Sequence, residues 1–191
     1  MITVQKDQPK IIVPDTSPLI HLAAVGALSI LNQLGQVIIA DMVVYEATAD
    51  LSKPWAIEIA TWIEEGMCKG SNELITIEKT ETGETFRLAL ITDSLHRMPN
   101  AGENAIIDWL STKTEEHKAI VVYENGRVPR AIERQGFNTD IAIMTTRALL
   151  GFAEFVGIIA SGEELWKQIE KAVPTVNRAN KTTIIRRTAN T

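Results

Sequence analysis

The chain has 191 residues, of which 45% are hydrophobic and 23% charged. These proportions are ordinary for a globular protein and exclude a fibrous or disordered chain. A chain of this length buries about 70% of its unfolded surface, so it folds without a disulfide or a structural metal. The single cysteine, Cys68, excludes an intramolecular disulfide and suits a reducing cytoplasm. No apolar run approaches the ~18 residues of a membrane span, and the N-terminus lacks the layout of a signal peptide. We therefore expect a cytoplasmic protein without a membrane segment.

The charge is unevenly distributed along the chain. The formal net charge of -5 argues against a general nucleic-acid coat protein. From residue 171 to the C-terminus there are five basic residues and no acidic residue, which leaves 14 basic and 24 acidic residues, a net charge of -10, on the rest. A frayed, solvated terminus explains the tail, and docking on the acidic body or binding of RNA are the alternatives. The basic residues are Lys171, Arg178, Lys181, Arg186 and Arg187.

Short apolar runs predict three buried strands: one that begins at residue 11 and ends before Asp15, and two at residues 37–40 and 120–123. Pro18 suits the first turn of the helix after the first strand, which Thr16 or Ser17 would cap. Helical segments with one apolar face separate and follow the strands. They lie at 27–34, from 41 onwards, and at 54–66, 105–110, 128–135, 145–156 and 163–172. Fully apolar strands separated by helices predict a three-layer α/β/α fold with a central, mainly parallel sheet.

Other segments complete the predicted organisation of the chain. Residues 74–90 alternate in part around Thr82-Gly83, which predicts a strand or a hairpin. Residues 182–185 are β-branched enough for a short terminal strand. We expect one domain over 1–160, with an insertion at about 50–100, followed by a C-terminal helix and basic tail over 161–191.

Four acidic residues lie at or near predicted strand ends. Asp15 directly follows the first strand, Glu46 lies in the helix after the second, Glu103 begins a later helix, and Glu124 directly follows the third strand. Ligands of open parallel sheets bind at the carboxyl ends of the strands. Clustered carboxylates repel each other unless a hard cation neutralises them, and oxygen-only donor sets select Mg²⁺ or Mn²⁺. Such ions activate water and bind phosphates, so phosphodiester hydrolysis is the reaction that this pattern favours.

Each acid also has a purely structural interpretation. Asp15 would cap a helix, Glu103 would interact with a helix dipole, Glu124 would belong to a polar turn, and Glu46 would lie on the surface.

Several motifs resemble those of PIN-domain ribonucleases, and in particular a bacterial and archaeal subgroup related to VapC toxins. The first is Asp15-Thr16-Ser17-Pro18-Leu19-Ile20, and the others follow in the order that the subgroup has. They are Gly26-Ala27-Leu28, the strand 37–40, Val43 with Glu46, Gly102-Glu103, the strand and polar pair at 121–125, the arginine-rich helix at 127–134 and Gly157-Ile158-Ile159. The resemblance covers roughly residues 11–160.

The resemblance implies a fold, a reaction and a set of residues. It implies a Mg²⁺- or Mn²⁺-dependent endoribonuclease that leaves a 5′-phosphate and a 3′-hydroxyl, with Asp15, Glu46, Glu103 and Glu124 as metal-binding acids. Thr16 or Ser17 would hydrogen-bond near the metal, and three basic residues would hold the RNA backbone: Arg127, Arg130 and Arg134. It also implies that the protein is the toxin of a toxin–antitoxin pair, with an antitoxin partner, and a homodimer.

The chain departs from the subgroup at the third strand, where an acid and an amide, Glu124-Asn125, replace two acids. Asn125 coordinates a metal without adding charge, and Asp140 further along could replace the missing ligand. This departure supports an alternative, a catalytically degenerate PIN fold that binds RNA or protein without cutting. A structural adaptor working through the 50–100 insertion is a third hypothesis.

Overall fold

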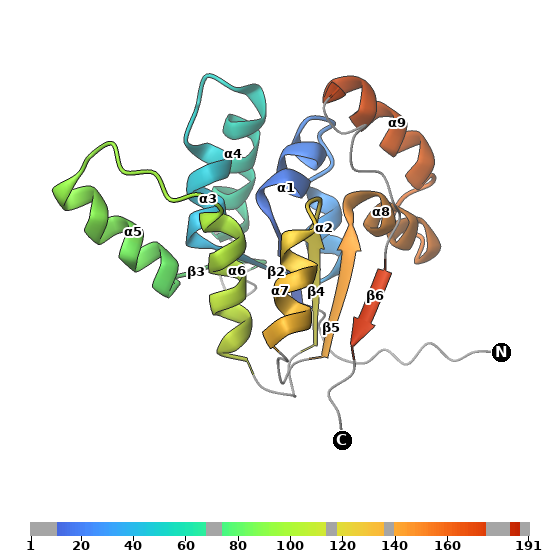
Figure 1. Ribbon diagram of the computed structural model, residues 1–191. Helices are drawn as coiled ribbons and strands as arrows, with labels where there is room; N and C mark the ends of the chain where they lie inside the picture. Colours follow the sequence, from blue (N-terminus) through green and yellow to red (C-terminus); the bar gives the residue numbers. More distant parts are fainter. Residues whose placement is uncertain (1–10, 68–73, 114–117, 136–139, 175–183, 188–191) are drawn as a thin grey trace.

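The computed structural model describes residues 11–67, 74–113, 118–135, 140–174 and 184–187. Its strands form one six-stranded sheet in the order β3-β2-β1-β4-β5-β6 (Figure 1). Neighbouring strands from β3 to β5 are parallel, and β6 pairs antiparallel with β5. The strands are β1 Ile11–Pro14, β2 Gln36–Ala40, β3 Ile75–Glu78, β4 Lys118–Tyr123, β5 Asp140–Thr145 and β6 Ile184–Arg187.

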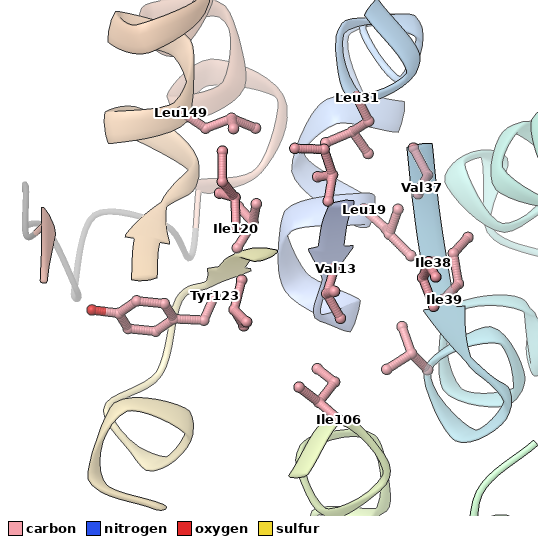
Figure 2. Close-up of a cluster of buried hydrophobic side chains, with 14 of the residues drawn as sticks. Val13, Leu19, Leu31, Val37, Ile38, Ile39, Ile106, Ile120, Tyr123 and Leu149 are labelled. Carbon is pink, nitrogen blue, oxygen red and sulfur yellow. The ribbon is translucent and has the colours of Figure 1, made fainter. Parts of the chain in front are cut away.

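Helices cover both faces of this sheet. Figure 2 shows Leu31 of α2 and Leu149 of α8 on one side of β1 and β4, and Ile106 of α6 on the other side. The helices are α1 Thr16–Ala23, α2 Ser29–Leu34, α3 Asp41–Thr48, α4 Pro54–Met67, α5 Glu81–Thr92, α6 Ala101–Ser111, α7 Arg127–Gln135, α8 Thr146–Phe155 and α9 Gly162–Ala172. The predicted three-layer α/β/α architecture is therefore confirmed. Within the described residues, no helix is both long and apolar enough to cross a bilayer.

The central strands are buried on both faces, which explains why their sequences are continuously apolar. Ile12 and Val13 of β1 and Val121 and Val122 of β4 are at most 1% exposed. β1 has β2 on one side and β4 on the other. The chain first adds β2 and β3 on one side of β1 and then adds β4 and β5 on the other side. Open α/β sheets bind ligands at such a switch point, outside the carboxyl ends of the strands, and we call this region, around Asp15 and Glu124, the crevice. The fold therefore places the residues that follow β1 and β4 at the usual binding position of an open α/β sheet.

The prediction for residues 74–90 is wrong in its second half. β3 ends at Glu78, and helix α5 begins at Glu81 because the Thr80 side chain accepts a hydrogen bond from the Gly83 backbone N–H. Thr82 and Gly83 are therefore in the first turn of a helix and not in a hairpin.

Two further differences concern the start and the end of elements. Asp15, and not Thr16 or Ser17, is the N-cap of α1. The sequence reading assigned no strand to residues 140–145, which form β5 and continue directly into α8. The predicted terminal strand is present as β6, shifted to 184–187. Cys68 and two basic residues of the tail, Arg178 and Lys181, lie outside the described residues.

Helix α5, in the predicted insertion, is fastened to the helices that carry two of the candidate acids. Its Thr82 donates hydrogen bonds from both the backbone nitrogen and the hydroxyl to Asp108 of α6, at 2.8 and 2.6 Å. Arg87 forms an ion pair of 2.7 Å with Asp41, the first residue of α3. Helix α5 of the insertion is therefore attached to α3 by an ion pair and to α6 by hydrogen bonds.

Candidate active site

Asp15 occupies the crevice at the carboxyl end of β1. Its backbone N–H donates to the Val122 carbonyl of β4 at 2.8 Å, and its Oδ1 accepts from the Thr16 backbone N–H at 2.8 Å. Only 3% of the residue is exposed. An aspartate is therefore held in the core at the point where β1 and β4 both end.

The pKa of Asp15 is raised from its ordinary value of 3.8 to about 7. Burial is the largest cause, and the hydrogen bond from Thr16 acts in the opposite direction. The negative charges of Glu103, Glu46 and Glu124 each raise the pKa further. Three glutamates from separate elements therefore contribute to the electrostatic environment of one buried aspartate.

Glu46 reaches the crevice from α3, although the residue is exposed. Its Oε2 accepts a hydrogen bond of 2.9 Å from the Thr16 hydroxyl, and its Oε1 accepts one of 3.0 Å from the Gly102 backbone N–H. A Cβ atom on Gly102 would lie 2.7 Å from Glu46 Oε2. Gly102 thus lets the Glu46 carboxylate lie directly against the backbone of α6.

Glu103 is next to Gly102 in the first turn of α6 and pairs with Asn125. The Asn125 side-chain amide donates to Glu103 Oε1 at 2.6 Å, and its carbonyl oxygen accepts from the Arg127 backbone N–H at 3.0 Å. The amide that replaces the second acid of the family pattern therefore contacts another candidate acid directly.

Glu124, which directly follows β4, is held by a contact with the start of α8. Its Oε1 accepts from the Thr146 backbone N–H at the start of α8, at 2.9 Å. His21 of α1 is buried, and its Nδ1 lies 3.6 Å from the same oxygen. That distance is beyond a hydrogen bond, and within the described residues His21 Nδ1 and the Thr146 hydroxyl have no hydrogen-bond partner. Two unsatisfied polar atoms therefore lie near Glu124, and a small movement of its carboxylate would pair the first of them.

Sequence reasoning named Gly102 only as part of a motif and did not include His21 or Thr146 among the site residues. His21 shares a helix face with Ser17, four residues earlier on α1, and its nearness to Glu124 depends on how α1 packs against β4. Thr146 has no signal in the sequence because its contribution is a backbone N–H. Ser17 is partly buried in the first turn of α1.

The structure does not bring Asp140 to this crevice. Asp140 is the first residue of β5 and is paired with Lys118, the first residue of β4, so it lies at the opposite end of the sheet from Glu124. The suggestion that Asp140 replaces a missing ligand is therefore wrong.

The three arginines of α7 are all exposed. Arg127 begins the helix close to the crevice, and the Arg130 guanidinium folds back beside Gly126. Arg134 is about 10 Å further along the helix axis, at 1.5 Å per residue. Arg127 and Arg130 are thus better placed than Arg134 for a ligand in the crevice.

The described part of the chain contains no three His, Cys, Asp or Glu side chains in the arrangement of a metal site. One oxygen or both of each of the three glutamates accept a hydrogen bond from a protein donor. The side chains nevertheless supply only oxygen ligands around a buried carboxylate, which is the donor chemistry that Mg²⁺ and Mn²⁺ prefer.

An open, parallel α/β sheet with acids gathered at its switch point defines a class of proteins that bind ligands at the carboxyl ends of their strands. A family model for the PIN domain matches residues 11–122, more than half of the chain. The chain belongs to the PIN domain family, which points to a nuclease-type activity. No curated protein matches the chain. The matched residues include Asp15, Glu46 and Glu103 and end just before Glu124.

Proposed function

We propose that the protein is a metal-dependent endoribonuclease that hydrolyses RNA phosphodiester bonds. Asp15, Glu46, Glu103 and Glu124 would hold Mg²⁺ or Mn²⁺. The observation that carries this proposal is the burial of Asp15 at the carboxyl end of β1, next to Thr16, whose hydroxyl donates a hydrogen bond to Glu46. Acidic side chains that raise the pKa of a buried aspartate destabilise the metal-free protein, which favours a functional role for them over a stabilising one.

The donors around the glutamates support this role. The Gly102 and Thr146 backbone N–H groups and the Asn125 amide each bind one oxygen of a different glutamate. These donors are neutral, so they orient the carboxylates without cancelling their charge. A bound divalent cation would neutralise the acids, activate water and stabilise charge on the phosphate.

The remaining parts of the site would hold the substrate and the acids. The Thr16 hydroxyl orients Glu46 through its hydrogen bond of 2.9 Å. Arg127 and Arg130 would bind RNA phosphates through their guanidinium groups, which carry positive charge on an otherwise acidic protein. Beyond this, we propose from the resemblance to VapC-related proteins that the chain is a cytoplasmic toxin that pairs with an antitoxin and forms a homodimer.

RNA cleavage by the purified protein tests the proposal. The assay compares wild type, Asp15→Asn and Glu58→Gln, with Mg²⁺, Mn²⁺ or EDTA present. Glu58 is an exposed acid on α4 and serves as the matched control. We expect cleavage in Mg²⁺ or Mn²⁺, none in EDTA, and a loss of at least about 100-fold in Asp15→Asn with no change in Glu58→Gln. Equal cleavage by all three proteins, or cleavage in EDTA, would refute it.

A catalytically degenerate PIN fold that binds RNA or protein is the second candidate. The Asn125 amide and the lack of a ready-formed metal geometry among the described residues favour it. The two candidates separate in one experiment: RNA binding without cleavage in any divalent cation supports the degenerate fold.

A further inference from the structure

Asn125 stands where the resemblance to VapC-related PIN domains implies a second acid, and its contacts give it a defined role. Its side chain joins two elements, because it contacts Glu103 in α6 and the backbone of Arg127 at the start of α7. Both contacts lie within hydrogen-bond length, at 2.6 and 3.0 Å.

The orientation of this amide is fixed by its two partners. Arg127 offers a backbone N–H, which only the carbonyl oxygen of the amide can accept. Glu103 offers a carboxylate oxygen, which only the NH₂ group can meet as a donor. The reverse orientation would place an oxygen against a carboxylate and a donor against a donor. The network therefore assigns the amide one orientation.

We propose that Asn125 is a positioning residue that fixes the carboxylate of Glu103 by donating a hydrogen bond to it. This inference rests on the proposed function for its purpose, since a fixed Glu103 is useful as a cation ligand. It differs from the sequence interpretation, in which Asn125 itself coordinates the metal. In this chain the NH₂ group is turned to Glu103 and the carbonyl oxygen to α7, so the side chain acts through Glu103.

An aspartate at position 125 would have the opposite effect on Glu103. It would keep the acceptor for the Arg127 N–H and replace the donor by a second carboxylate oxygen. Two carboxylates at 2.6 Å repel each other unless a proton or a cation lies between them. The amide therefore lets Glu103 stay in place when no cation is bound.

The hydrogen bond itself is tested by exchanging the two groups in EDTA at pH 8. Asn125→Asp keeps the acceptor for the Arg127 backbone N–H and replaces the donor to Glu103 by a negatively charged oxygen, so we expect a lower melting temperature than wild type. Adding Glu103→Gln restores a donor–acceptor pair with the roles reversed. We compare the change in melting temperature that Glu103→Gln causes in two backgrounds, wild type and Asn125→Asp. We expect the increase to be larger in the Asn125→Asp background. Additive effects of the two substitutions would overturn the proposal.

The positioning role is tested with Mn²⁺ binding, measured by calorimetry. We expect Asn125→Ala to weaken Mn²⁺ binding about 10-fold in the wild-type background and to leave it unchanged in a Glu103→Ala background. The same fold-loss in both backgrounds would show that Asn125 is a ligand or only a cap, and would overturn the proposal. No loss in the wild-type background would also overturn it. The matched control is Asn104→Ala, which replaces an exposed asparagine on α6, the helix that carries Glu103. This variant should bind Mn²⁺ as wild type does.

The two proposals fail in different ways. If wild type binds no Mn²⁺, the metal-dependent function fails, and the purpose assigned to Glu103 fails with it. The group-exchange experiment in EDTA contains no metal and still decides whether Asn125 fixes Glu103.

Discussion

Asp15 makes the stability of the metal-free protein depend on pH. Its pKa is about 7 when folded and 3.8 ordinarily, so the folded state holds the proton more tightly. A group of this kind destabilises the fold once it must ionise, so stability falls as pH rises from about 4 to about 7. We expect Asp15→Asn to be more stable than wild type in EDTA at pH 8 by at least about 1 kcal/mol, since each pKa unit corresponds to ~1.4 kcal/mol.

Urea unfolding in EDTA at pH 4 and pH 8 measures this effect. The asparagine keeps the oxygen that accepts from the Thr16 N–H, so the cap of α1 is retained. The advantage of the variant should vanish at pH 4, and added Mg²⁺ should raise the melting temperature of wild type only. A variant less stable than wild type at pH 8 would mean that Asp15 is a structural cap and no more.

Gly102 is predicted to control the position of Glu46. A methyl group at this position would lie 2.7 Å from Glu46 Oε2, the end of a flexible side chain, so the carboxylate would move and the backbone would not. Gly102→Ala should therefore keep the melting temperature, or raise it through the higher helix propensity of alanine. Cleavage should fall at least about 10-fold. A variant with wild-type activity would show that the placement of Glu46 does not matter.

At the scale of elements, β6 covers an edge of the sheet that would otherwise be open. β6 pairs with β5 from Ile141 to Met144. A chain that ends at Pro174 lacks this strand and exposes the hydrogen-bonding groups of β5. We expect the truncated chain to lose at least about 1 kcal/mol, a fall of roughly 2–4 °C in melting temperature. An unchanged melting temperature with a weaker salt dependence of RNA binding would show instead that the tail binds phosphate.

The strands that were predicted correctly from the sequence are the ones that a polar turn separates from the next element. β1, β2 and β4 are short apolar runs that end in polar residues, and the structure has them where they were expected. β5 was missed because Thr145 ends the strand and caps α8, so no turn divides the two elements. The alternation of Phe86, Leu88 and Leu90 in α5 suggested a strand, yet Leu88 is 60% exposed and only Phe86 is buried.

The candidate site was predictable in its position but not in its contacts. Asp15 and Glu124 follow strands, and parallel strands end at one edge, so the topology alone brings them together. The Asn125–Glu103 hydrogen bond joins residues that are 22 positions apart and depends on how α6 and α7 pack. The Gly102 contact with Glu46 depends on the angle between α3 and α6. Distances of this kind follow from packing and have no signature in the order of residues.

At the scale of the whole molecule, an acidic chain must bind RNA through a few basic side chains. The formal net charge is -5, so long-range attraction to RNA is absent and each local arginine counts. We expect Arg130→Ala to weaken RNA binding in EDTA and to reduce the slope of log K against log[salt] by about 0.7 to 0.9, one phosphate contact. Filter binding over a range of salt concentrations measures the slope. Arg97→Ala, an exposed arginine before α6, should leave the slope unchanged, and an equal effect of both variants would count against a defined RNA path over α7.

The central claim is that four acids from separate elements share one function, the binding of a divalent cation. A crystal structure with Mn²⁺, read by anomalous scattering at the manganese edge, tests this claim most directly. We predict an anomalous peak within coordination distance of the Asp15 carboxylate and of at least two of Glu46, Glu103 and Glu124. No peak at this crevice at saturating Mn²⁺, or a peak held by other side chains, would contradict the account.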